Sequence, residues 1–320
     1  MRSQKFIQAD GERMIGSSLM SLNVAGLSAR ADAQNEPLTA LQIVERIRKN
    51  LGAAWKDSEL DVFCAGDPGT HVTGIATSFA PSLDVLRRAA SGKKNMIIVR
   101  EHLFYRHNNM PSFMPVEDLI AKDPACNAKR AFIEKNNLVI WRFTDNVQSR
   151  SVDGQLSGLA RALKWEGYRQ SGDKSRGQSF RKEDSFFVLP ETTLKDLALS
   201  IGETLHSKGM RMIGDPAASV RKVALSPGLI KVPVLEKLLQ EPAVDAVVTG
   251  EPIEWEASPY FQDVIASGQK KGMIIIGLAA SEDPGSGEIA RWLGTIVPEV
   301  SVEWIPIGDP FWMLKPLKQA

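Results

Sequence analysis

Short apolar runs alternate with amphipathic segments along most of this chain. The runs "NMIIV" (95–99) and "LVIWRF" (138–143) are rich in β-branched and aromatic residues, which predicts buried strands. Segment 38–52 carries apolar residues at three- and four-residue steps, which predicts an amphipathic helix that ends at Gly52. The same alternation returns after residue 185. It predicts an α/β fold with two similar α/β halves, each with a mixed, mostly parallel sheet covered by helices.

Two stretches lack this pattern, the N-terminal residues 1–34 and the polar segment 169–184. Residues 1–34 start with basic residues, continue without charge and reach small residues at Ala31 and Ala33, an order typical of an export signal. Asp10 and Glu12 lie in the basic part and favour a disordered extension instead, so an exported or periplasmic location and a cytoplasmic one both stay open. The predicted parts are a leader or extension, an N-terminal half, a polar connector and a C-terminal half: 1–34, 35–168, 169–184 and 185–320.

Composition narrows the classes of partner. The net charge of the 320 residues is +1, which gives no electrostatic reason to expect nucleic acid or a membrane surface as partner. No stretch reaches the roughly 18 uncharged apolar residues of a membrane span. Cys64 and Cys126 lie too far apart for a zinc ribbon or a disulfide framework. With only 4 histidines, any metal site must depend on carboxylates.

Carboxylates follow several of the apolar runs. The residues that do so are Glu101, Asp145, Glu251 and Glu282. Ligands of open α/β sheets bind at the carboxyl ends of the strands, so these side chains are candidates for one shared site. Several negative groups in one cleft need a counter-charge, which a divalent cation could supply together with an activated water. The alternative is that these carboxylates form salt bridges with Arg100, Arg142 or lysines.

A glycine motif offers a weaker signal. "GSGEIA" (285–290) has the spacing GxGxxA and opens the segment 287–298, which is predicted to be helical. A dinucleotide fingerprint must follow its strand directly, whereas the strand expected before this motif ends at Gly277. The motif therefore predicts a glycine-containing loop before a helix N-terminus rather than a nucleotide site.

Three separated blocks carry a resemblance to a known family. They are "GDPGTHVTGIATSFAPSLDVLRRAASGKKNMIIVREHLFY", "WRFTDNVQSRSVDGQLSGLARALKWEGY" and "VDAVVTGEPIEWEASPYFQDVIASGQKKGMIIIGLAASEDPGSGEIARWL". In this order they resemble the NIF-three-like family, also called the YbgI-type, GTP cyclohydrolase I type two or dinuclear-metal-centre hexameric family. The resemblance runs from about Leu38 to Phe311. It implies the NIF-three-like fold, a dinuclear metal site and a homo-oligomer, a hexamer built as a trimer of dimers.

The chain departs from the family at the metal ligands. Positions where the family has histidines are occupied by Arg100, Thr144, Asn146, Gln148 and Leu278. The carboxylates Asp145, Glu251 and Glu282 match the family pattern, Glu101 matches one branch of it, and His102 stands where proline is usual. Because a guanidinium does not lose its proton, Arg100 cannot be a metal ligand. The resemblance therefore implies a depleted metal site.

Two functions remain open. In the first, the protein is a non-catalytic, ligand-binding relative without metal, in which Arg100 is an internal counter-ion and a small anionic ligand is bound. In the second, it is a mononuclear metal-dependent hydrolase acting on a phosphate, purine or amide-like substrate. Glu101, Asp145 and Glu282, with His102 or water, would then hold one divalent ion (Mg, Mn or Zn), and Glu251 would be the catalytic base or would orient a metal ligand.

Overall fold

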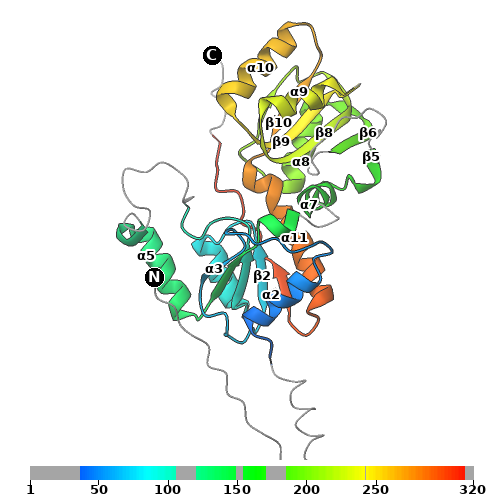
Figure 1. Cartoon of the computed structure of the whole chain (residues 1–320). Helices are drawn as coiled ribbons and strands as arrows, with labels where there is room; N and C mark the ends of the chain where they lie inside the picture. The colour runs from blue at the N-terminus through cyan, green and yellow to red at the C-terminus, as the bar shows by residue number, and fades with distance from the viewer. Residues whose placement is uncertain (1–36, 106–119, 149–153, 171–184, 242, 314–320) are drawn as a thin grey trace, which may run out of the picture. The chain divides into compact units, whose positions relative to one another are not determined.

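The computed structural model of the chain describes residues 37–105, 120–148, 154–170, 185–241 and 243–313 (Figure 1). The predicted leader or extension (1–34) lies outside the described residues. So does the predicted connector (169–184), apart from its first two residues. None of the helices in the described ranges is long and apolar enough to cross a membrane.

The first sheet has five strands in the order β1-β4-β3-β2-β11. Their bounds are Phe63–Ala65 (β1), Val139–Arg142 (β4), Met96–Val99 (β3), Ile75–Ser78 (β2) and Val302–Trp304 (β11). Four of them run parallel, and β1 pairs antiparallel with β4. Every residue of β2, β3 and β4 is buried, as the apolar run of β3 predicts, although β2 and β4 end in the polar residues Ser78 and Arg142. The carboxyl ends of these parallel strands therefore meet at one edge of the sheet.

Helices cover both faces of this sheet. The helices of this half are α2 (Ala40–Lys49), α3 (Leu83–Ser91), α5 (Pro124–Lys135) and the short α6 (Asp145–Gln148). Local sequence sets their starts: Thr39 forms a capping box with Gln42, and Ser82 and Asp123 cap α3 and α5. Apolar side chains of α2 pack on one face of the sheet, and those of α3 and α5 pack on the other.

The second sheet has six strands in the order β5-β6-β8-β9-β10-β7. Their bounds are Arg169–Gln170 (β5), Ser185–Thr193 (β6), Ser219–Ile230 (β8), Ala246–Pro252 (β9), Gly272–Ile275 (β10) and Arg211–Ile213 (β7). The strands β8, β9 and β10 are parallel, and the flanking pairs are antiparallel. The mixed sheets confirm the predicted fold class.

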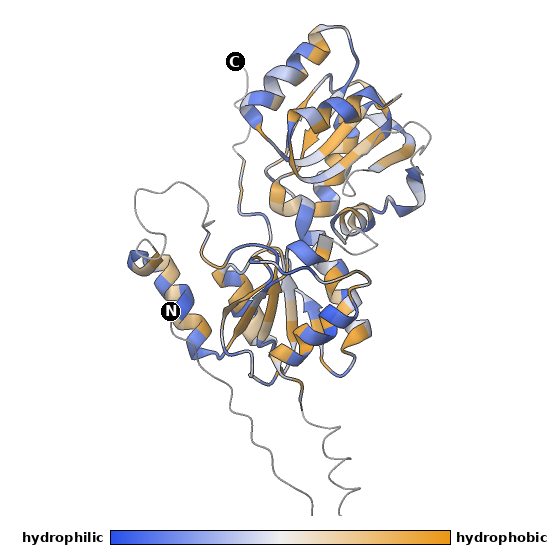
Figure 2. Cartoon of the chain, viewed as in Figure 1, coloured by the Kyte–Doolittle hydropathy of each residue, from blue (hydrophilic) through white to orange (hydrophobic). Residues whose placement is uncertain are grey.

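Both faces of the second sheet are covered as well. The elements involved are α7 (Gly154–Ala162), the 3₁₀ turn η1 (Glu166–Tyr168), α8 (Leu194–Leu205), α9 (Val232–Gln240) and α10 (Glu254–Ala266). Apolar residues of α7 and α8 form one core with the sheet, and those of α9 and α10 form another. Figure 2 shows hydrophobic residues concentrated on the strands and on the helix faces next to them.

The helix α11 (Leu278–Ile296) contacts strands of both sheets and packs closely on α7. The predicted start of this helix at Gly287 is wrong, because "GSGEIA" lies inside α11 rather than in a loop before it. The glycines of the motif lie against neighbouring elements: a Cβ atom at Gly285 would lie 3.0 Å from Cα of Gln155, and one at Gly287 would lie 2.9 Å from the indole ring of Trp304. A Cβ atom at Gly158 of α7 would lie 2.4 Å from the carbonyl oxygen of Pro284, so the two helices approach at a distance that only glycine permits. After α11 the chain returns to the first sheet, where β11 pairs with β2 rather than with a strand of the second sheet.

Candidate functional site

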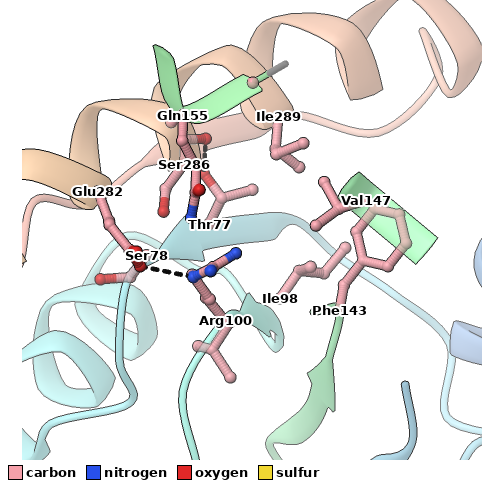
Figure 3. A pocket seen from close by; sticks show the side chains of 13 residues that line it. Thr77, Ser78, Ile98, Arg100, Phe143, Val147, Gln155, Glu282, Ser286 and Ile289 are labelled. Carbon is pink, nitrogen blue, oxygen red and sulfur yellow. Dashed lines mark hydrogen bonds and ion pairs between the residues drawn. The ribbon is translucent and has the colours of Figure 1, made fainter. Parts of the chain in front are cut away.

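A small cavity lies where the first sheet meets α11 and α7 (Figure 3). We call it the Arg100 cavity, and its volume is about 40 Å³. Its polar lining comes from Thr77, Ser78, Arg100, Gln155, Glu282 and Ser286, and its apolar lining includes Ile98, Phe143, Val147 and Ile289. It lies at the carboxyl ends of β2 and β3, the edge at which open α/β sheets bind ligands.

An ion pair joins two sides of this cavity. The Nε atom of Arg100 lies 2.6 Å from Oε2 of Glu282, and the two side chains are 19% and 7% exposed. The N–H bond of Nε is not directed at the oxygen, so the contact is an electrostatic pairing rather than an aligned hydrogen bond. In Figure 3 the terminal nitrogens of Arg100 point away from Glu282 and into the cavity. The pair therefore leaves one edge of the guanidinium facing the cavity.

Backbone contacts fix the segment that carries Arg100. The amide groups of Arg100 and Glu101 both donate to the carbonyl oxygen of Phe79, at 3.2 and 2.9 Å. The hydroxyl of Thr144 donates to the carbonyl oxygen of Arg100. Thr144, which the resemblance placed at a histidine position, thus supports the arginine segment.

The position of Glu282 depends on a glycine of the second sheet. Gly228 has a φ of +79° at an irregularity of the pairing between β8 and β9, and its N–H donates to Oγ of Ser281. A Cβ atom at Gly228 would lie 2.4 Å from Oε1 of Glu282. Only glycine therefore satisfies both the backbone conformation and the space that the carboxylate needs.

His102 faces a second arginine rather than Glu282. Nδ1 of His102 lies 2.5 Å from Nη1 of Arg142. The other nitrogens of this guanidinium, Nε and Nη2, donate hydrogen bonds to the carbonyl oxygens of Leu60 and Glu59. A guanidinium nitrogen only donates, so the imidazole nitrogen against it must be an unprotonated acceptor. Arg142 thus places a positive charge beside the imidazole, where a divalent cation would have to lie.

The other predicted carboxylates do not join Glu282. Asp145 is exposed and accepts a hydrogen bond from the hydroxyl of Ser58. Glu251 is an exposed residue of β9, and Glu101 is half-buried. Of the predicted site residues, the structure brings together Arg100 and Glu282, and the part of the chain it covers holds no group of three or more His, Cys, Asp or Glu side chains suited to a metal ion. The residues present therefore do not fit the dinuclear metal centre that the resemblance implies.

Asp61 is a structural carboxylate that the sequence patterns do not single out. It is 5% exposed and accepts hydrogen bonds from the backbone N–H groups of Thr144, Asp145 and Asn146. It also accepts from the side-chain amide of Asn146, which is itself bonded to the backbone of Lys56. Thus Asn146, at another expected histidine position, is part of a hydrogen-bonded loop.

Asp283, the neighbour of Glu282, is 4% exposed and has neutral partners. It accepts hydrogen bonds from the N–H groups of Phe79 and Ile307 and from the indole of Trp304. Burial raises the pKa of the Asp283 carboxyl, and these hydrogen bonds act in the opposite direction. Asp283 thus fixes α11 to the end of β2 and to the chain after β11.

A larger cavity of about 530 Å³ lies beside Asp283. Its lining includes the first turn of α11 and the segment 306–311, and most of the lining side chains are apolar. The carboxylate of Asp309 on this segment accepts from the backbone N–H groups of Lys208, Gly209 and Phe311. The two acids that line this cavity, Asp283 and Asp309, thus hold the backbone in place.

Comparison with known proteins agrees with this fold. A sequence model of the family Duf34/NIF3 (NGG1p interacting factor 3) matches residues 39–308, so the chain belongs to this family. Comparison with curated protein sequences finds no match.

Solved structures with the same fold have little sequence in common with the chain. The Staphylococcus aureus hypothetical protein SA1388 has a TM-score of 0.62 at 14% identity, with 87% of this chain and 100% of that chain covered. A Bacillus cereus protein related to NIF3 has the same TM-score and identity, with 88% and 100% covered. The protein ybgI, described as of unknown function, has a TM-score of 0.60 at 19% identity, with 86% and 100% covered. These likenesses show the fold alone.

Proposed function

We propose that this protein is a non-catalytic, ligand-binding member of the Duf34/NIF3 family in which an arginine–glutamate ion pair replaces the metal centre. The observation that carries the proposal is the contact of 2.6 Å between Arg100 and Glu282 at the edge of the Arg100 cavity. A buried carboxylate needs a counter-charge, and the guanidinium supplies it without a metal ion. The ligand is a small anion, because the free edge of Arg100 faces the cavity.

The alternative of a mononuclear metal-dependent hydrolase has less support. It requires Glu101, His102, Asp145 and Glu282 to converge on one ion. Instead His102 lies against Arg142, and Asp145 is exposed and bonded to Ser58. The hexamer implied by the resemblance stays a prediction.

Metal binding by the full chain tests the proposal. We expect elemental analysis of the purified protein to find no stoichiometric divalent ion. We also expect Mg²⁺, Mn²⁺ or Zn²⁺ to leave the melting temperature unchanged relative to protein in EDTA. A variant that combines Arg100→His with Leu278→His is the comparison, since it restores two imidazoles and removes the competing cation. One divalent ion per wild-type chain, with a rise in melting temperature, would overturn the proposal.

A further inference from the structure

The chemistry of the Arg100 cavity also defines which anion it takes. We infer that its ligand is a small monocarboxylate with a short apolar tail, bound by the guanidinium of Arg100 and the hydroxyl of Ser78. This inference rests on the proposed function and adds to it the class of ligand and a residue that determines specificity.

The first argument is the shape of the free donor edge. Glu282 occupies the Nε side of the guanidinium, and the terminal nitrogens of Arg100 point into the cavity (Figure 3). Two parallel N–H donors on this edge match the two oxygens of a planar carboxylate. A cation would be repelled by the guanidinium, and a neutral apolar molecule would leave these donors without an acceptor.

The second argument is a buried hydroxyl without a partner. Ser78 is 1% exposed, lines the cavity, and its Oγ makes no hydrogen bond to any residue that the structure describes. A buried polar group without a partner is costly, and in native proteins such a group calls for an explanation. Ser78 lies at the end of β2, and Figure 3 places it beside the Arg100–Glu282 pair. A carboxylate bound at Arg100 would give the hydroxyl its acceptor.

The third argument concerns the size and charge of the ligand. The cavity volume is about 40 Å³, and one water needs roughly 10–15 Å³ by the same measure, so the ligand has only a few heavy atoms. Its apolar walls, Ile98, Phe143, Val147 and Ile289, suit a short hydrocarbon tail. Glu282 already neutralises Arg100, so a phosphate dianion would leave two uncompensated charges in a buried site, whereas a carboxylate leaves one.

The test measures binding of acetate, propionate, butyrate, chloride and phosphate to the full chain at constant ionic strength, by calorimetry and by thermal shift. We expect propionate or butyrate to bind and to raise the melting temperature, and phosphate and chloride to have no effect. Ser78→Ala should weaken carboxylate binding roughly tenfold to a hundredfold, the factor for one hydrogen bond to a charged ligand. Val147→Ala should move the preference to an acid with a longer tail, because it enlarges the apolar wall.

Thr249→Val is the matched control. Thr249 is 0% exposed, and its hydroxyl also has no hydrogen-bond partner among the described residues, but it does not line the Arg100 cavity. Removing it should leave carboxylate binding unchanged. Equal effects of Ser78→Ala and Thr249→Val, or no effect of either, would overturn the role of Ser78.

The outcomes separate this inference from the proposed function. Phosphate binding that is lost in Arg100→Gln would overturn the carboxylate inference and leave the proposed function standing. Absence of binding for every anion would overturn the inference together with the anion-binding part of the proposed function, but not the replacement of the metal centre by the ion pair. If a divalent metal ion then proves to bind stoichiometrically, the proposed function fails as well.

Discussion

Two adjacent buried carboxylates on α11, Glu282 and Asp283, are stabilised by different kinds of partner. Glu282 lies against the guanidinium of Arg100 beside a cavity of about 40 Å³. Asp283 accepts hydrogen bonds from three neutral N–H groups beside a cavity of about 530 Å³. In the first case a formal charge supplies the compensation, and in the second case dipoles do. The comparison shows that the side chain facing a buried carboxylate, rather than its position in the chain, determines its chemistry.

The largest expected effect comes from removing one member of the ion pair. Glu282→Ala should lower the free energy of unfolding by about 3–4 kcal/mol, because it leaves the largely buried guanidinium of Arg100 without its counter-ion. Urea denaturation measures the loss. Arg100→Met combined with Glu282→Gln should recover most of it, since neither charge then remains. A loss below about 1 kcal/mol in the single variant would mean that the pair is screened by solvent.

A smaller loss is expected at the neighbouring carboxylate. Asp283→Ala should lower the free energy of unfolding by about 2 kcal/mol, because three N–H donors lose their acceptor. Water from the larger cavity can replace part of these bonds, and no formal charge is left unpaired. The same denaturation experiment ranks the two variants. A loss larger than that of Glu282→Ala would reverse the comparison between charge and dipole.

The smallest expected effect is the pH dependence of the stability that Asp283 contributes. Burial raises its pKa above the ordinary value of 3.8, so the folded protein binds more protons than the unfolded chain between the two pKa values. The contribution of Asp283 is therefore fully present below about pH 4 and is lost as the pH rises through the raised pKa. Asp283→Asn does not titrate, so the stability of the wild type relative to this variant should increase as the pH falls from 7 to 4. If the stability of the wild type relative to Asp283→Asn instead decreases as the pH falls, the N–H donors outweigh burial in setting the pKa of Asp283.

Much of the fold could be predicted from sequence because its signals are local. The strands β3 and β4 arise from short apolar runs, and the start of α2 is set by the capping box of Thr39 and Gln42. The extent of α11 could not be predicted in this way. Pro284 and its neighbouring glycines are typical of a loop, but contact with Gly158 of α7 favours a continuous helix there. Tertiary packing outweighed local propensity at this element.

The candidate site likewise has features that the sequence predicts and features that only the tertiary structure reveals. By itself, the sequence determined that imidazoles are missing at positions 100, 144, 146, 148 and 278 and that an arginine follows β3. Only the tertiary structure decided that Arg100 meets Glu282, that His102 meets Arg142 and that Ser78 lines the same cavity as Arg100. The physical reason is that these side chains lie at strand ends, in the loop after β3 and on α11, which are distant in sequence, so no local periodicity fixes which of them meet. Each side chain there takes the direction that its neighbours from distant parts of the chain make most stable.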